Sequence, residues 1–139
     1  MKLKMTQEEK MLLIKDLSAR LPYVVTVEHT SGFRGTLHDM TVHHMYDDND
    51  NVYNAICYTD FFGDEDSIYI EYFKPYLFPL SSMTEEQSKI YHELIGGMFG
   101  TSALINFEAL EDFFNKNHID YRGLIPMGIA LDATGKNIY

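Results

Sequence analysis

The sequence has a single cysteine, Cys57, and no apolar run long enough to span a membrane. A lone cysteine cannot form an intramolecular disulfide, which excludes the class of small secreted proteins held together by disulfides and fits a reducing compartment. The apolar stretch 11–14 is too short for a signal peptide, and charged residues follow it at once. These absences predict a soluble cytoplasmic protein that does not enter a membrane.

Motifs for catalysis are missing as well. The chain has no Gly-x-Ser-x-Gly motif, no Gly-x-Gly-x-x-Gly or Walker loop, no paired cysteines and no His-x-His spacing. Cys57 falls in a predicted strand with no base beside it, which excludes an obvious thiol nucleophile. Neither 47–51 nor 60–71 has the glycine and glutamate spacing of a calcium loop. We therefore expect no cofactor, and a binding protein is better supported than an enzyme.

Basic residues are scarce. The chain has 139 residues, with 11 Lys and Arg against 21 Asp and Glu, a net charge of −10 and a pI near 4.8. Such a charge disfavours direct binding to nucleic acids or to anionic membranes. The length and a hydrophobic content of 45% predict one globular domain, residues 1–139, with a substantial core.

Two prolines divide the chain into an N-terminal part, 1–72, and a C-terminal part, 85–139. Pro75 and Pro79 lack a backbone N–H, so we expect the joint 73–84 to be an extended connector and not a central strand. Before the joint, the patterns predict a helix at 6–20 and strands at 23–28, 33–37, 40–46 and 52–59, with 67–72 as a fifth strand or a helical turn. After it, they predict helices at 85–98 and 106–117 and a short strand at 129–131.

Local signals fix several helix ends. Thr6 with Glu9, and Thr84 with Gln87, are spaced as capping boxes. The last helix is expected to begin at a cap on Asn106, with a staple between its flanking apolar residues, Ile105 and Leu110. Apolar spacing in that helix predicts that four side chains face the core: Phe107, Leu110, Phe113 and Phe114.

The order of elements predicts an α+β fold. We expect an N-terminal helix, a small curled antiparallel sheet and two C-terminal helices. Gly35 lies inside the second strand, where a glycine is typical of a bulge or a bend. Short strands bent in this way favour a curled sheet, and a small SH3-like barrel is one form it could take.

Parts of the chain resemble a known family. The matching stretches are 5–10 with Leu21-Pro22-Tyr23, 74–77, 79–84 and 115–125. They lie in the two ends and the joint, and the regions that they mark make up about half of the chain. They resemble small proteins, without an assigned activity, of Bacteroides-type gut bacteria and their mobile elements and phages. The segment 33–72 has no counterpart in the resemblance, which implies a source but no mechanism.

The most unusual feature is the segregation of charge. Residues 35–73 contain nine acidic residues and neither lysine nor arginine. Aromatic residues are interleaved with the acids, and Phe61-Phe62-Gly63 stands directly before Asp64-Glu65-Asp66. Solvated loops around core aromatics would explain the pattern, and so would a contact surface for a basic partner.

The contact surface is our first functional hypothesis. It describes a non-enzymatic accessory protein that inhibits or modulates a basic protein partner, and spaced carboxylates could imitate a phosphate backbone toward a nucleic-acid-binding protein. Adjacent phenylalanines cannot both point inward from a strand, so Phe61 and Phe62 are the expected anchor. The candidate partner-binding residues are Asp47, Asp48, Asp50, Asp60, Phe61, Phe62, Asp64, Glu65 and Asp66.

A second hypothesis places a ligand or a metal elsewhere. His38, Asp39, His43 and His44 fall within seven residues and carry metal-ligating groups, although His43 and His44 point to opposite faces of a strand. A weak hydrolase could use them. Tyr121 and Arg122 could hold an anion or a nucleotide, or Arg122 could pair with Asp120 or with helix-end carbonyls.

Overall fold

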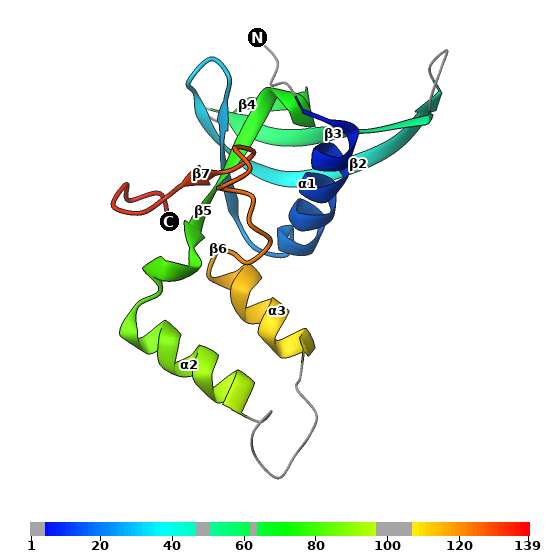
Figure 1. Ribbon diagram of the computed structural model, residues 1–139. Helices are drawn as coiled ribbons and strands as arrows, with labels where there is room; N and C mark the ends of the chain where they lie inside the picture. Colours follow the sequence, from blue (N-terminus) through cyan, green and yellow to red (C-terminus); the bar gives the residue numbers. More distant parts are fainter. Residues whose placement is uncertain (1–4, 47–50, 62–63, 97–106) are drawn as a thin grey trace.

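The computed structural model describes residues 5–46, 51–61, 64–96 and 107–139. One helix precedes a run of strands, two helices follow, and two very short strands complete the chain (Figure 1). The elements are α1 Gln7–Arg20, β1 Val25–His29, β2 Arg34–Tyr46, β3 Asn51–Phe61, β4 Asp64–Tyr69, β5 Phe73–Pro79, α2 Glu85–Gly96, α3 Phe107–Lys116, β6 Ile119–Asp120 and β7 Leu131–Asp132. Short 3-10 turns, Ile70–Tyr72 and Leu80–Ser82, flank β5.

The seven strands form one mixed sheet in the order β4-β3-β2-β1-β5-β6, with β7 also paired to β5. Pairing is antiparallel from β4 to β5 and parallel where β5 meets β6 and β7. The α+β class is therefore confirmed, but the all-antiparallel, curled sheet is wrong. The path ends at β4 on one side and β6 on the other, so the described strands form an open sheet and not a barrel.

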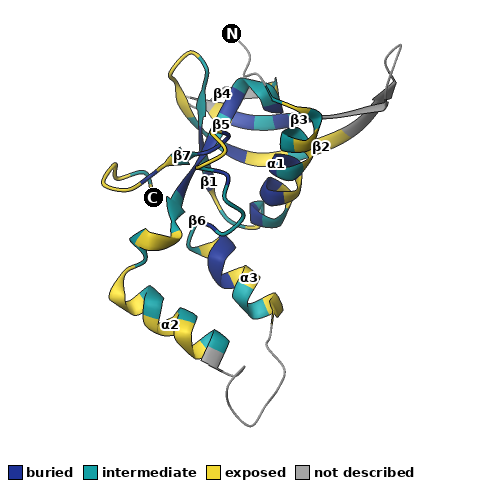
Figure 2. Cartoon of the chain, viewed as in Figure 1, coloured by how far each residue is buried: buried dark blue, intermediate teal, exposed yellow. Residues whose placement is uncertain are grey.

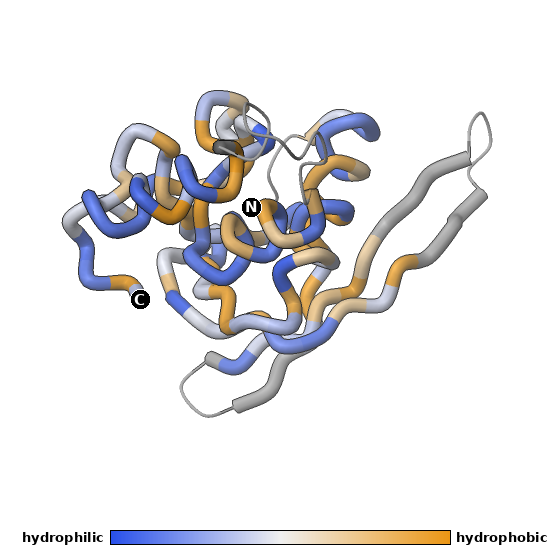
Figure 3. Tube along the Cα trace, turned by 90° about the horizontal axis from the view of Figure 1, so that it is seen from below, coloured by the Kyte–Doolittle hydropathy of each residue, from blue (hydrophilic) through white to orange (hydrophobic). Residues whose placement is uncertain are grey.

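The expected strands 33–37 and 40–46 are one strand, β2, which runs beside β3 (Figure 3). Its pairing with β3 shifts between Leu37 and Asp39, so His38 is the extra residue of a bulge. Gly35 pairs regularly with Val27, and the bulge expected there is wrong. A bulge keeps the strand continuous while it changes which residues face each side.

The proline joint is also different from expectation, because most of it is strand β5, inside the sheet. Residues 73–75 pair with β1, and residues 76–79 pair with β7 and β6. The ladder to β1 stops at the pair of Val27 with Pro75. A proline is tolerated in this strand because the strand exchanges partners there.

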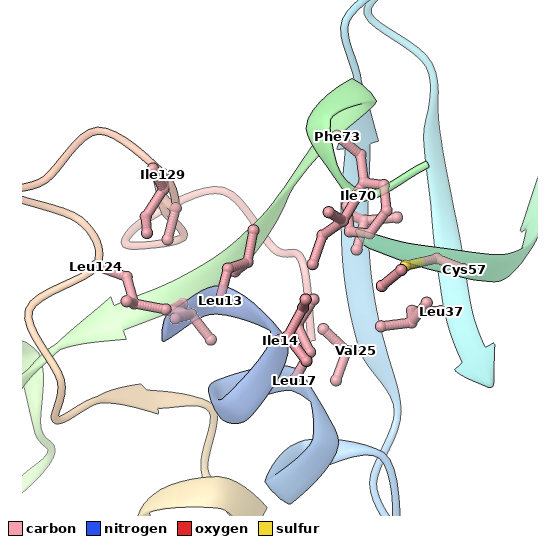
Figure 4. Close-up of a cluster of buried hydrophobic side chains, with 14 residues drawn as sticks. Leu13, Ile14, Leu17, Val25, Leu37, Cys57, Ile70, Phe73, Leu124 and Ile129 are labelled. Carbon is pink, nitrogen blue, oxygen red and sulfur yellow. The ribbon is translucent and has the colours of Figure 1, made fainter. Parts of the chain in front are cut away.

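Helix α1 packs on one face of the sheet and forms the main core (Figure 4). Its capping box is confirmed, since Thr6 Oγ1 accepts from Glu9 N–H and Glu9 Oε1 accepts from Thr6 N–H, both at 3.0 Å. The buried side chains of this helix are Leu13, Ile14 and Leu17, together with Asp16 and Arg20. The facing core residues include Val25, Val27, Leu37, Ala55, Cys57, Ile70 and Phe73.

Helices α2 and α3 form a second, smaller cluster around Phe113, Phe114 and Ile119. The capping box of α2 is confirmed, with Gln87 N–H donating to Thr84 Oγ1 at 3.1 Å. Phe107 is 65% exposed, so its expected place in the core is wrong. The buried residues of α3 lie in its last turns, near β6. Phe107 is in the first turn, away from this buried end of the helix. Ile105 and Asn106, and with them the expected cap and staple, lie outside the described residues.

Candidate functional site

The face of the sheet opposite α1 is built by β2, β3 and β4. In β3, Ala55, Cys57 and Thr59 are buried on the side of α1. Because side chains alternate along a strand, Ile56, Tyr58 and Asp60 lie on the opposite side. Figure 2 shows buried residues in α1, β1, β3 and β5, while the described part of β2 includes exposed stretches. The sheet is therefore covered on one side over the central strands and accessible on the other.

Strand register brings residues of β2 and β4 beside those of β3. Ile56 is paired with Thr41 on one side and Tyr69 on the other. Tyr58 is paired with Asp39 and Ser67 in the next row. We call this surface the outer face; its described side chains are Asp39, Thr41, Ile56, Tyr58, Asp60, Ser67 and Tyr69. It presents one aliphatic side chain and two tyrosine rings, with the carboxylates of Asp39 and Asp60 in the row of Tyr58 and the row next to it.

Exposure of these side chains supports a contact surface. Asp39, Thr41, Asp60 and Ser67 are exposed, and Tyr69 is 43% exposed. Ile56 and Tyr58 are half-buried between the strands. A half-buried apolar strip with exposed charges at its margins has the anatomy of an interface, with a hydrophobic centre and a polar rim.

Cations do not neutralise this surface. The sequence of β2 after Arg34, of β3 and of β4 contains no lysine or arginine. Arg34 is engaged by Glu28 at 3.9 Å and lies over the ring of Tyr76. Glu71 pairs with Lys10 at 3.5 Å, but Asp39 and Asp60 have no ion pair in the part of the chain that the structure describes. The outer face therefore carries an uncompensated negative charge.

The predicted partner-binding residues belong to two segments. Asp60 and Phe61 end β3, and 64–66 begin β4, with Asp60 opposite Glu65. Asp47, Asp48, Asp50 and Phe62 lie outside the described residues. Strand β3 connects the two segments, and its eleven residues span about 33 Å. Of these two acidic segments, 60–66 is the one that adjoins the outer face, because it contains Asp60.

Sequence reasoning missed Ile56, Tyr58 and Tyr69 as site residues. Residues 52–59 do not alternate between apolar and polar types, so no face could be assigned to them. The bulge at His38 also hid the position of Asp39, which depends on pairing with a strand some twenty residues later in the chain.

The structure separates part of the histidine group. His38 and Asp39 are both exposed at the bulge, while His43 and His44 pair with Asn54 and Tyr53 farther along the hairpin. The side chains of His43 and His44 are not among those described. Within the residues that are described, no three His, Cys, Asp or Glu side chains are grouped as metal ligands would be. The metal hypothesis stays a prediction.

Tyr121 and Arg122 lie beside a buried ion cluster. Asp16, fully buried, accepts from Arg20 at 2.7 and 3.1 Å and from Arg122 Nε at 3.2 Å. The guanidinium of Arg122 lies 4.7 Å from the ring centroid of Tyr121 and donates to its hydroxyl at 2.9 Å. The expected pairing of Arg122 with Asp120 is wrong, because that carboxylate accepts the backbone N–H groups of residues 124 and 125.

These contacts give the cluster a structural function. Arg20 also donates to the carbonyl of Ile119 at 2.7 Å, so the cluster joins α1 to the segment after α3. Arg122 has little exposed side chain, 16%. The hypothesis that Tyr121 and Arg122 hold a ligand stays a prediction.

Cys57 is fully buried in β3. Burial, with a smaller contribution from the Glu71 carboxylate, raises the pKa of the Cys57 thiol to about 12. The thiol is therefore protonated at neutral pH and unsuited to nucleophilic chemistry.

None of the described helices combines the length and the apolar character needed to cross a membrane.

A comparison with protein-family models finds no match for this chain. The curated proteins contain no significant match, and neither do the solved structures.

Proposed function

We propose that this chain is a non-enzymatic protein-binding module whose outer face holds a basic surface of a partner protein. The observation that carries the proposal is the strip of half-buried Ile56 and Tyr58 and exposed Tyr69. It lies beside Asp39 and Asp60, in a part of the chain without lysine or arginine. Tyrosines supply large contact areas at a small cost in conformational entropy. Uncompensated carboxylates accelerate encounter with a positively charged partner.

Charge determines the kind of partner. Phosphate backbones and anionic lipid surfaces are repelled by a chain of net charge −10, which leaves proteins with clustered lysines and arginines. Nucleic-acid-binding proteins carry such clusters, and binding there would inhibit or modulate them. The exposed carboxylates near the apolar strip would then occupy positions that phosphates otherwise take.

The test is a calorimetric titration with a synthetic lysine-rich peptide as the probe. One variant, Asp39→Asn/Asp60→Asn, removes two carboxylates from the outer face. A matched control, Glu93→Gln/Glu111→Gln, removes two exposed carboxylates from α2 and α3, so both variants have a net charge of −8 instead of −10. We expect the outer-face variant to bind about tenfold more weakly than the wild type, and the control to change affinity by less than about threefold.

A second arm holds charge constant and changes the apolar strip. Tyr69→Thr removes the ring and replaces it with a β-branched residue, which also favours strand structure. Affinity should again fall by about tenfold, as expected for an aromatic anchor at an interface. Equal losses in the two charge variants, together with no effect of Tyr69→Thr, would mean that the peptide senses only overall charge, and the proposal would be abandoned.

A further inference from the structure

Strand β4, Asp64–Tyr69, is the edge of the sheet. Among the described strands its one neighbour is β3, so one side of β4 has its backbone N–H and C=O groups unpaired within the sheet. Ser67 and Tyr69 are exposed on the outer face in the second half of this strand. At the other end of the sheet, β6 is two residues long and offers no comparable edge.

We infer that a basic, extended segment of the partner binds by adding a strand to the open edge of β4. This inference rests on the proposed function and names its mode of binding. Backbone hydrogen bonds along β4 provide affinity, while alternate side chains of the added strand lie on the outer face. Lysines and arginines at those positions come next to Ser67 and Tyr69, the described outer-face residues of β4.

Charge disfavours the simplest competitor, a second copy of this chain. Three of the six residues of β4 are acidic: Asp64, Glu65 and Asp66. Two β4 strands placed edge to edge would form a pair with six acidic residues and neither lysine nor arginine, and this excess of like charge opposes self-pairing. The same acids that oppose self-association favour a strand that carries lysines or arginines.

The experiment changes the probe and leaves the protein intact. The probe is a twelve-residue peptide in which lysine alternates with threonine, prepared unmodified and in two backbone-methylated forms. One form has N-methyl groups at the lysines, and the other has them at the threonines. Both keep every charge and side chain, but each loses the N–H donors along one edge of the extended peptide. Affinities are measured by calorimetry, and residue-resolved amide exchange is measured in the complex by NMR.

Strand addition predicts that one methylated form binds at least tenfold more weakly than the unmodified peptide, while the other binds nearly as well. Alternate amides within 64–69 should exchange at least tenfold more slowly in the complex. Equal affinities of all three peptides with unchanged β4 exchange would overturn strand addition. In that case, weaker binding by Asp39→Asn/Asp60→Asn would leave the proposed function standing. No effect of this variant would overturn the proposed function together with strand addition. Self-association of the free chain at the concentrations used would also overturn the inference.

Discussion

The hydroxyl of Tyr139 donates a hydrogen bond to the backbone carbonyl of Tyr76 at 2.8 Å. The same hydroxyl accepts the backbone N–H of Thr26 at 3.0 Å. It therefore bridges β1 and β5 at the position that follows the pair of Val27 with Pro75, where the ladder stops. Although 43% of Tyr139 is exposed, burial of its hydroxyl end raises the pKa of the phenol to about 12. A side chain from the last segment thus continues a strand pairing that proline interrupts.

Replacing this hydroxyl should destabilise the fold. Tyr139→Phe keeps the ring but leaves the Thr26 N–H and the Tyr76 carbonyl without their partner, and we expect a loss of roughly 1–3 kcal/mol in the free energy of unfolding. Tyr91→Phe is the matched control, because the Tyr91 hydroxyl makes no hydrogen bond among the described residues and its ring packs on Phe114. Urea denaturation measures both. A Tyr139→Phe protein as stable as the control would show that the bridge contributes nothing.

The shared carboxylate of Asp16 predicts an order of stabilities. Asp16→Ala leaves two guanidinium groups, one of them fully buried, without a counter-charge, and should cost about 3–5 kcal/mol. Arg122→Met should cost less, because Arg20 still pairs with Asp16 and Arg122 is partly exposed. Glu93→Gln, on the exposed surface of α2, should lie within about 0.5 kcal/mol of the wild type. Denaturant titrations of the three variants test the order, and Asp16→Ala as mild as Arg122→Met would contradict it.

His118 makes stability depend on pH. Its ring stacks on Tyr139 with centroids 3.6 Å apart, and burial, followed by the nearby charge of Arg20, lowers its pKa from 6.5 to about 4. The fold therefore favours the neutral imidazole. This contribution is fully present above pH 6.5 and is lost as the pH falls from 6.5 toward 4.

The variant His118→Asn isolates this effect. Asparagine tolerates the positive φ of 59° at this position and does not titrate. Between pH 7 and pH 4.5, the wild type should lose roughly 1–2 kcal/mol more than the variant, after allowance for solvent screening of a partly exposed ring. Parallel stability curves for the two proteins would show that His118 is not the responsible group.

Features set by neighbouring residues could be predicted from the sequence. The capping boxes at Thr6 and Thr84 depend on contacts three residues apart, and both form as expected. The strand at Pro75 could not be predicted, because local chemistry argues against it. It depends on a change of partners and on the hydroxyl of Tyr139, which lies 63 residues after Tyr76 in the sequence. The exposure of Phe107 could not be predicted either, because it depends on how much of α3 packs against α2 and β6.

In the candidate site too, local features could be predicted from the sequence and features set by distant pairing could not. Composition alone revealed an acidic, aromatic segment without cations. Which of its residues share a face depends on the bulge at His38 and on the register of β2, β3 and β4, and both are set by pairing between distant segments. The pairing of Asp16 with Arg122, 106 residues apart, was hidden for the same reason.

The most direct test of the outer face is a map of where a basic probe binds. NMR chemical-shift changes are recorded while the lysine-rich peptide is added to the labelled chain. The account predicts that the largest changes occur at outer-face residues, among them Ile56, Tyr58 and Tyr69, and that they diminish as salt is raised. Changes concentrated instead on the exposed glutamates of α2 and α3, such as Glu93 and Glu111, would contradict it.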